Sequence, residues 1–420
     1  MNEVSRNKGE AAAAAAGWGA LAGLRVLDLT QALAGPYCTQ MLGDHGAEVV
    51  KIEPLVSGDL ARVTGPFHAA DTEKVNSGYF HSINRNKKSV VVDLKQPEGR
   101  DLILALVPQF DVVVENFRAG VMDRLGLGYE VLRERNPKLV YATVRGFGDP
   151  RSGASPYVNW PAFDVVAQAM GGIAGITGPD ADQPMKIGPG VGDIVPALYL
   201  TIGVLAAVIR ARSTGEGQFV DVSMVDAMLA TTERIVHQWS FGKIIAKPEG
   251  NFHPLMSPFG IYPAKDGHVA VATVSQDFFQ TLCNELGSPE IPQIEAYSSQ
   301  QARASAGRPL DLIISEMTRK FTRQELTDKL GGKIPFGPVY TMADIAQDEH
   351  FAAREMLVPI DVPGIPETVY IAGVPIKMSE TPGRVARPGP RQGEHSDEIL
   401  AQAGFTADQI EAWRSAGVIR

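Results

Sequence analysis

The first part of the chain alternates short runs rich in β-branched residues with stretches of helical character. Within residues 25–147 these runs are RVLDL, AEVVKIE, SVVVDL, FDVVVENF and LVYATVRGF, and QFVDVSM follows at 218–224. Strands that alternate with helices are typical of a parallel sheet with helices on its faces. Sites in such sheets lie beyond the carboxyl ends of the strands. The first candidates for chemistry are therefore the polar residues there: Thr30, Glu53, Asn116 and Arg145.

The same pattern predicts how the chain divides into domains. We expect residues 1–23, with their alanine tract, to form a flexible tail, and residues 24–230 to form a large α/β domain. Residues 231–350 differ in character: a Pro-punctuated loop, the strand-like HVAVATV and amphipathic helices predict a smaller second domain. Residues 351–420 return to strand character at TVYIAGVPI and close with a helical stretch.

One stretch, Ile194 to Ile209, is almost wholly apolar. It is shorter than the roughly 20 residues that a bilayer requires, and Asp193 and Arg210 bound it. We expect a buried helix here and no membrane association.

Composition narrows the functional classes. The 420 residues are 44% hydrophobic and 21% charged, which suits a globular chain with two cores. A formal net charge of −9, with no long Lys/Arg run, argues against nucleic acid as a partner. The two cysteines, Cys38 and Cys283, match neither a disulfide framework nor a zinc-ligand spacing, which favours a reducing cytoplasm.

Common cofactor and nucleophile motifs are missing from the sequence. The first βαβ unit ends its second strand on Glu53, but its turn reads TQALAGP where a nicotinamide-binding turn would read GxGxxG. No GxxxxGK[ST], HExxH or GxSxG occurs either. The stretch GPGVG, residues 188–192, is glycine-rich and precedes a helix, so its backbone N–H groups suit an anion.

Asp193 follows this glycine loop directly and admits two interpretations. As a helix N-cap, its carboxylate would accept hydrogen bonds from the first-turn N–H groups. As a nucleophile, it would be accessible beside the glycines, kept ionised by the helix dipole, and able to attack an acyl carbon.

Several cationic or polar residues stand at strand ends or just after them: Lys95, Asn116, Arg124 and Arg145. Singly, each suits a solvated surface. Together they would line a basic mouth for a phosphorylated ligand, since Arg binds phosphate bidentately. His253 and His395 lie in Pro- or Gly-rich loops without a partner at metal-ligand spacing, so we expect both to pack structurally.

Longer motifs give the chain a family resemblance. The motifs that show this resemblance include RVLDLTQALAGPYCTQMLGDHGAEVVKIE, INRNKKSVVVDLKQPEG, DVVVENFRAGVMDRLGLGYE, GVGDIVPALYLTIGVLAAV, STGEGQFVDVSMVDA, IPFGPV and GEHSDEIL. In this order they resemble the class III CoA-transferases, of the formyl-CoA:oxalate, carnitine and succinyl-CoA:dicarboxylate kind, from Leu24 to the C-terminus. Several long motifs in one order are far more specific than any single one.

The resemblance implies a chemistry and a site. Asp193 matches the family's nucleophile, which carries a covalent aspartyl intermediate. Coenzyme A is the cosubstrate, and no metal or permanently bound cofactor is required. The family's CoA-contacting positions match a set of residues in this chain: Leu33, Ala34, Val92 to Lys95, Asn116, Phe117, Arg118, Arg124, and Arg145 to Phe147.

The resemblance also implies an architecture. It predicts a Rossmann-like large domain built from both ends of the chain, so that residues 351–420 return to it, and a smaller α+β domain. It further predicts an interlocked homodimer.

Departures from the family's patterns bear on the substrate. Leu33 replaces a glutamine of formyl-CoA:oxalate transferase, Phe147 replaces an aromatic hydroxyl, and a run of glycines is missing around NFHPLMSPFG. These differences disfavour formyl and oxalyl groups, and we expect succinyl-CoA or a similar short acyl-CoA as donor and a carboxylic acid as acceptor. Racemases of the same fold carry a histidine where this chain has Phe163. A racemase or a non-catalytic CoA-binding protein remains the alternative.

Overall fold

The computed structural model describes residues 18–420, which divide into two compact units. The first unit comprises residues 18–172, 188–233 and 349–420, so both ends of the described chain belong to it. The second unit comprises residues 173–187 and 234–348.

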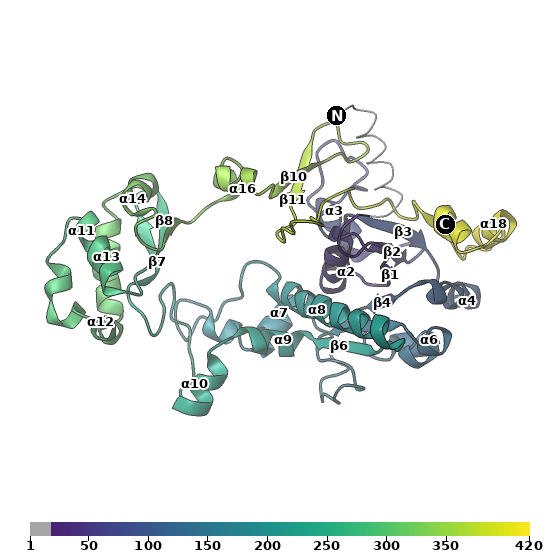
Figure 1. The fold of residues 1–420 in the computed structure, drawn as a ribbon, viewed down its shortest axis with the longest axis horizontal. Coiled ribbons are helices and arrows are strands. Elements are labelled where there is room, and N and C mark those ends of the chain that lie inside the picture. The colour runs from purple at the N-terminus through teal and green to yellow at the C-terminus, as the bar shows by residue number, and fades with distance from the viewer. Residues whose placement is uncertain (1–17) are drawn as a thin grey trace. The chain divides into compact units, whose positions relative to one another are not determined.

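A six-stranded parallel sheet forms the centre of the first unit, and this confirms the predicted parallel sheet. Its strands run side by side in the order β3-β2-β1-β4-β5-β6 (Figure 1). Their bounds are β1 (Arg25–Asp28), β2 (Glu48–Glu53), β3 (Lys87–Val91), β4 (Val112–Glu115), β5 (Val140–Arg145) and β6 (Phe219–Ser223). The order reverses between β1 and β4, which is where open α/β sheets leave a crevice for ligands.

Helices cover both faces of this sheet. On one face, α2 (Ala34–Asp44) and α8 (Val191–Thr214) pack on each other and on the strands. On the other face, a hydrophobic core joins alternate strand residues to Met122 of a short helix and to four longer helices. These are α4 (Pro97–Leu106), α6 (Tyr129–Arg135), α17 (Ser396–Gln402) and α18 (Ala407–Ser415). Helices near the C-terminus therefore pack on strands from the N-terminal half of the chain and complete this core.

The first unit has further short elements. They are α3 (Gly78–Asn84), α5 (Val121–Arg124), α7 (Asp164–Met170), α9 (Met224–Thr231), α16 (Glu349–Ala353) and an antiparallel pair, β10 (Leu357–Ile360) and β11 (Val369–Ala372). The strand expected at TVYIAGVPI is β11, which pairs with β10 rather than with the central sheet.

The second unit combines a small antiparallel sheet with helices. The sheet is β7 (Phe259–Ala264), β8 (Gly267–Ala272) and β9 (Phe336–Pro338). The helices are α10 (Ile235–Gly242), α11 (Gln276–Glu285), α12 (Gln300–Ala306), α13 (Arg308–Thr318), α14 (Arg323–Leu330) and α15 (Met342–Ile345). Its core buries apolar side chains of β7, β8 and the amphipathic helices α11, α13 and α14.

Two segments differ from the predicted boundaries. Residues 173–187, expected in the large domain, belong to the second unit, where the Gly250 N–H donates to the Gly178 carbonyl at 2.9 Å. Residues 1–17 of the expected tail lie outside the described residues. Residues 18–23 bond to the turn after α2, since the Leu21 N–H donates to the His45 carbonyl at 2.9 Å.

The apolar stretch 194–209 lies within α8, a helix of 24 residues. By length and composition this helix would pass for a membrane span, but 44% of its most apolar window is buried. One face packs on α2, α9, β5 and β6. The opposite face leaves Leu198, Tyr199, Ile202 and Ile209 exposed. The prediction of a buried helix is therefore correct for one face only, because α8 lies in the outer layer of the unit.

Candidate active site

Asp193 lies in the first turn of α8, and it does not cap the helix. Gly190 occupies the N-cap position, and the backbone N–H of Asp193 donates to the Gly190 carbonyl at 3.1 Å. Within residues 18–420, no hydrogen bond to the Asp193 carboxylate is found. The N-cap interpretation of Asp193 is therefore wrong, and its carboxylate is left available for chemistry.

A second carboxylate, Asp164 at the start of α7, stabilises the first turn of α8 instead. Its Oδ1 accepts a hydrogen bond from the Gly192 N–H at 2.8 Å, and Gln168 Nε2 donates to both of its oxygens at 2.9 Å. The contact requires glycine at 192, because a Cβ there would lie 2.5 Å from the Asp164 carbonyl oxygen. Asp164 is not among the residues predicted from the sequence, since its only signal there is an acidic residue at the start of a helix, 28 positions before Gly192.

The surroundings of Asp193 favour its protonated form. Burial, reinforced by the negative charge of Asp164, raises the pKa of Asp193 to about 7. The helix dipole was expected to keep this group ionised, and burial acts in the opposite direction. A carboxylate formed here is poorly solvated and accepts no compensating hydrogen bond from the described residues.

Tyr79 of α3 lies close enough to Asp193 and Asp164 for their charges to act on it. Burial, followed by the charges of Asp193, Asp59 and Asp164, raises the pKa of its phenol to about 12. The phenol therefore stays neutral at physiological pH and keeps a proton to donate. Tyr79 is not among the residues predicted from the sequence, because only the folded chain brings α3 close to Asp193.

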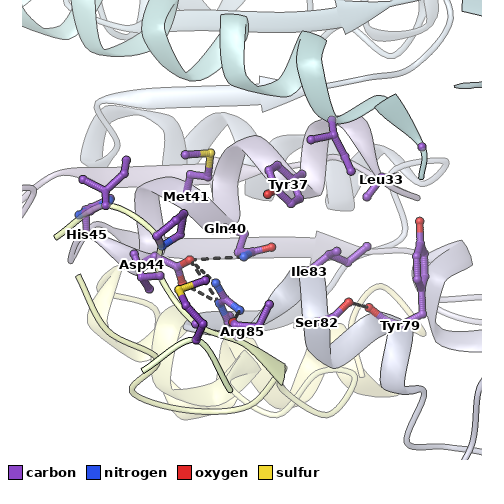
Figure 2. Close-up of a pocket in the computed structure, with 18 residues that line it drawn as sticks. Leu33, Tyr37, Gln40, Met41, Asp44, His45, Tyr79, Ser82, Ile83 and Arg85 are labelled. Carbon is purple, nitrogen blue, oxygen red and sulfur yellow. Dashed lines mark hydrogen bonds and ion pairs between the residues drawn. The ribbon is translucent and has the colours of Figure 1, made fainter. Parts of the chain in front are cut away.

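A cavity of about 400 Å³ opens beside the start of α8. Figure 2 shows Leu33, Tyr37 and Tyr79 toward one end of it and Asp44, His45 and Arg85 toward the other. Gly190 and Ile194, on either side of Asp193 in the chain, also line it. At the far end, Arg85 is already paired with Asp44 at 2.7 Å, so its charge is balanced.

The turn between β1 and α2 carries two of the predicted CoA contacts. Leu33 is half-buried at the N-cap of α2, and Ala34 is buried. A Cβ on Gly190 would lie 3.0 Å from Leu33 Cδ2, so Leu33 lies directly against the glycine loop before Asp193. The fold thus brings Leu33, a predicted CoA residue, into contact with the glycine loop.

Asn116 and Phe117 follow β4 at the reversal of strand order. The Asn116 amide binds the backbone of Gln31 twice, accepting from its N–H at 2.9 Å and donating to its carbonyl at 2.8 Å. The side chain of Asn116 therefore bridges β4 to the β1–α2 turn, and it orients that turn.

Arg145 ends β5 and is buried among carboxylates. Its guanidinium bonds to Glu115 and Asp149, and its Nε donates to the Phe117 carbonyl at 2.9 Å. Burial raises the pKa of Glu115 despite the Arg145 charge. The predicted phosphate contact at Arg145 stays a prediction, and in this structure the guanidinium holds the strand ends together. Phe147 is also buried, with its ring against Tyr157 and Trp160.

The remaining predicted CoA positions are spread over the strand ends. Arg118 and Arg124 are exposed just beyond β4, where their charges meet solvent. Val92 is buried after β3 and bridges to Ile419, whereas Lys95 is exposed in the following turn. Because β2 and β1 separate β3 from β4, the structure groups Asn116, Phe117, Arg118, Arg124 and Arg145 but keeps Val92 and Lys95 apart from them.

Comparisons with known proteins identify the family of the chain. A model of CoA-transferase family III matches residues 21–396. The succinyl-CoA:mesaconate CoA-transferase of Haloarcula hispanica is 45% identical over 386 residues, covering 92% of this chain and 97% of that protein. The succinate–glutarate CoA-transferase of Agrobacterium fabrum is 38% identical over 390 residues, covering 91% and 95%.

The fold has a solved relative as well. A CaiB/BaiF family protein from Brucella suis superposes with a TM-score of 0.81 at 33% identity, covering 92% of this chain and all of that one.

Proposed function

Because the chain belongs to CoA-transferase family III, and transfers CoA between an acyl-CoA and a carboxylic acid, we propose that succinyl-CoA or a similar short acyl-CoA is its donor. The acceptor is a short dicarboxylic acid, and Asp193 carries CoA between the two. The observation that carries this proposal is the Asp193 carboxylate, partly buried behind a glycine loop and free of hydrogen bonds from the residues that the structure describes.

The proposed first half-reaction has two balanced steps. An Asp193 oxygen attacks the thioester carbonyl carbon, the C–S bond breaks, and CoA thiolate leaves a mixed anhydride behind. The thiolate then attacks the Asp193 carbonyl carbon and expels the donor as its free carboxylate, which gives an aspartyl-CoA thioester.

The second half-reaction runs these steps in reverse with the acceptor. Its carboxylate attacks the thioester and releases the thiolate, which takes the acceptor acyl group and restores the Asp193 carboxylate.

Two features support a short succinyl-like group. Leu33 presents apolar surface to the cavity beside the start of α8, which has a volume of about 400 Å³. The two transferases compared above are named for succinyl-CoA with mesaconate and for succinate with glutarate. The racemase alternative needs a proton-transferring group before Asp164, and this chain has the exposed apolar Phe163 there.

An interlocked homodimer, in the cytoplasm, is part of the same proposal. The exposed apolar side chains of α8, together with Phe163, Val165 and Met170 around α7, form a surface that a second copy would cover.

The substrate proposal is tested by offering purified protein succinyl-CoA with single acceptors and following new thioesters by mass spectrometry. We expect CoA transfer to mesaconate, glutarate or citramalate and none with the Asp193→Ala variant. If carnitine or phenylacrylate alone receives CoA, the dicarboxylate assignment is wrong although the transferase assignment stands.

A further inference from the structure

In the turn between β1 and α2, every backbone N–H and carbonyl group from the Thr30 N–H to the Ala32 N–H forms a hydrogen bond with a side chain. Asp28 accepts a hydrogen bond from the Thr30 N–H at 2.9 Å. The Asn116 amide accepts from the backbone N–H of Gln31 and donates to its carbonyl. Most backbone groups in proteins bond to other backbone groups, so five consecutive groups bonded to side chains are unusual. The remaining two bonds come from the pair that follows.

Lys51 and Asp59 supply those two bonds. Lys51 Nζ donates to the Thr30 carbonyl at 2.7 Å, and Asp59 Oδ1 accepts from the Ala32 N–H at 2.9 Å. The two side chains also form an ion pair, with Nζ 2.7 Å from Oδ2 and neither side chain exposed. Both residues come from outside the turn, Lys51 from β2 and Asp59 from the loop after it.

The charges of this pair are costly to bury. Burial alone lowers the pKa of Lys51, but the carboxylates of Asp59, Asp28 and Glu53 outweigh it and raise that pKa above its ordinary value. A buried ion pair rarely gains stability over apolar residues of similar size, and its best-attested use is to fix one geometry. The turn that this pair binds contains a backbone conformation that has to be fixed, at Ala32.

The backbone at Ala32 is strained. Its φ is +67°, a left-handed conformation that alanine seldom adopts and glycine adopts freely. Such strain persists only where surrounding contacts impose it. Directly after Ala32 comes Leu33, whose side chain lies against the Gly190 loop and lines the cavity beside Asp193.

We infer that the buried Lys51–Asp59 pair is a positioning device for the active site: it holds Ala32 in its left-handed conformation and so sets Leu33 against the loop that precedes Asp193. The inference rests on the proposed function, since it assumes that chemistry occurs at Asp193. Lys51 and Asp59 touch no substrate in this account, and they act through the turn.

The test uses the full-length protein with succinyl-CoA and the best acceptor of the panel. Asp59→Ala removes the acceptor for the Ala32 N–H, whereas Asp59→Asn keeps an acceptor oxygen there and is the variant to use if the alanine variant does not fold. Each is made with and without Ala32→Gly, because glycine takes the left-handed conformation without help. The matched control is Asp311→Ala in the second unit, a buried carboxylate that accepts bonds from Ser257 and Tyr262.

We expect Asp59→Ala to lower kcat by about tenfold or more, because a small misplacement near the reacting groups is costly, while the KM for succinyl-CoA changes little. Hydrogen exchange of the peptide around Ala32 should accelerate. Adding Ala32→Gly should restore about fivefold of the lost kcat, in line with the smaller cost of the left-handed conformation for glycine. The Asp311→Ala control should lose thermal stability but keep its kcat.

Other results would overturn the inference. Unchanged kcat in the Asp59 variants would do so, as would an equal loss in Asp311→Ala or no rescue by Ala32→Gly. A failure of the proposed function looks different: Asp193→Ala would then keep its activity, or the wild type would transfer no CoA in the panel.

Discussion

Replacing Asp193 with Asn should stabilise the protein at neutral and higher pH. Burial and the charge of Asp164 raise the pKa of Asp193 from its ordinary 3.8 to about 7. In the unfolded chain this carboxyl loses its proton near pH 4, whereas in the folded protein it keeps the proton to about pH 7. The folded state therefore binds more protons between these values, so the stability that Asp193 costs grows as the pH rises through this window.

The size of the effect follows from the two pKa values. Since one pKa unit corresponds to about 1.4 kcal/mol, the buried carboxylate costs roughly 4 kcal/mol at pH 8 and roughly 1.7 kcal/mol at pH 5. Asn carries no such charge, and the cost of burying its amide is the same at both pH values. The stability gained by Asp193→Asn should therefore be greater at pH 8 than at pH 5 by about 2.5 kcal/mol.

Chemical denaturation of the wild type and the variant at both pH values measures this difference. Mass spectrometry of the variant must show that the introduced asparagine has not deamidated. Asp277→Asn, which removes an exposed carboxylate from the first turn of α11, is the control and should give no pH-dependent gain. An Asp193→Asn gain that is absent, or equal at both pH values, refutes the assignment of Asp193 as a desolvated carboxyl.

Two further predictions concern neighbouring charges. Asp164→Asn removes the second cause of the raised Asp193 pKa, so the pH midpoint of kcat should move to lower pH, and an unchanged midpoint in a pH–rate profile would assign the shift to burial alone. Arg124→Ala should raise the KM for acyl-CoA with little change in kcat. Arg145→Ala should instead lower the free energy of unfolding by about 3 kcal/mol, because it leaves Glu115 buried without its partner. Denaturation and steady-state kinetics of both variants distinguish CoA binding by Arg124 from a structural role of Arg145. A stability loss in Arg124→Ala and a KM effect in Arg145→Ala would contradict both assignments.

Local sequence patterns were sufficient to predict the central sheet. All six strands overlap the predicted β-branched runs, although β3 begins at Lys87, before the run SVVVDL. Parallel strands buried on both faces need apolar residues almost continuously. The pattern could not show that α8 has an exposed apolar face, since periodicity does not reveal which side of a helix meets the sheet.

Residue roles that depend on distant partners were beyond the sequence. Arg145 has the type and place of a phosphate ligand, yet Glu115 lies 30 positions away and the fold alone brings them together. Lys51 lies within the run AEVVKIE, and only the folded turn shows its bond to the Thr30 carbonyl. Asp193 itself was identified through the family motif, whereas the deciding observation, that Gly190 caps α8, needed coordinates.

The central proposal is that Asp193 binds CoA covalently while CoA passes from donor to acceptor. The most direct test incubates the wild type with succinyl-CoA and hydroxylamine and then maps the modified peptide by mass spectrometry. Hydroxylamine attacks the activated Asp193 carbonyl, releases CoA or succinate, and leaves a stable hydroxamate on that side chain. We predict a hydroxamate on the peptide that contains Asp193, dependent on succinyl-CoA and absent from Asp193→Ala. Continued CoA transfer with no label at Asp193, or with the label on another residue, would contradict the account.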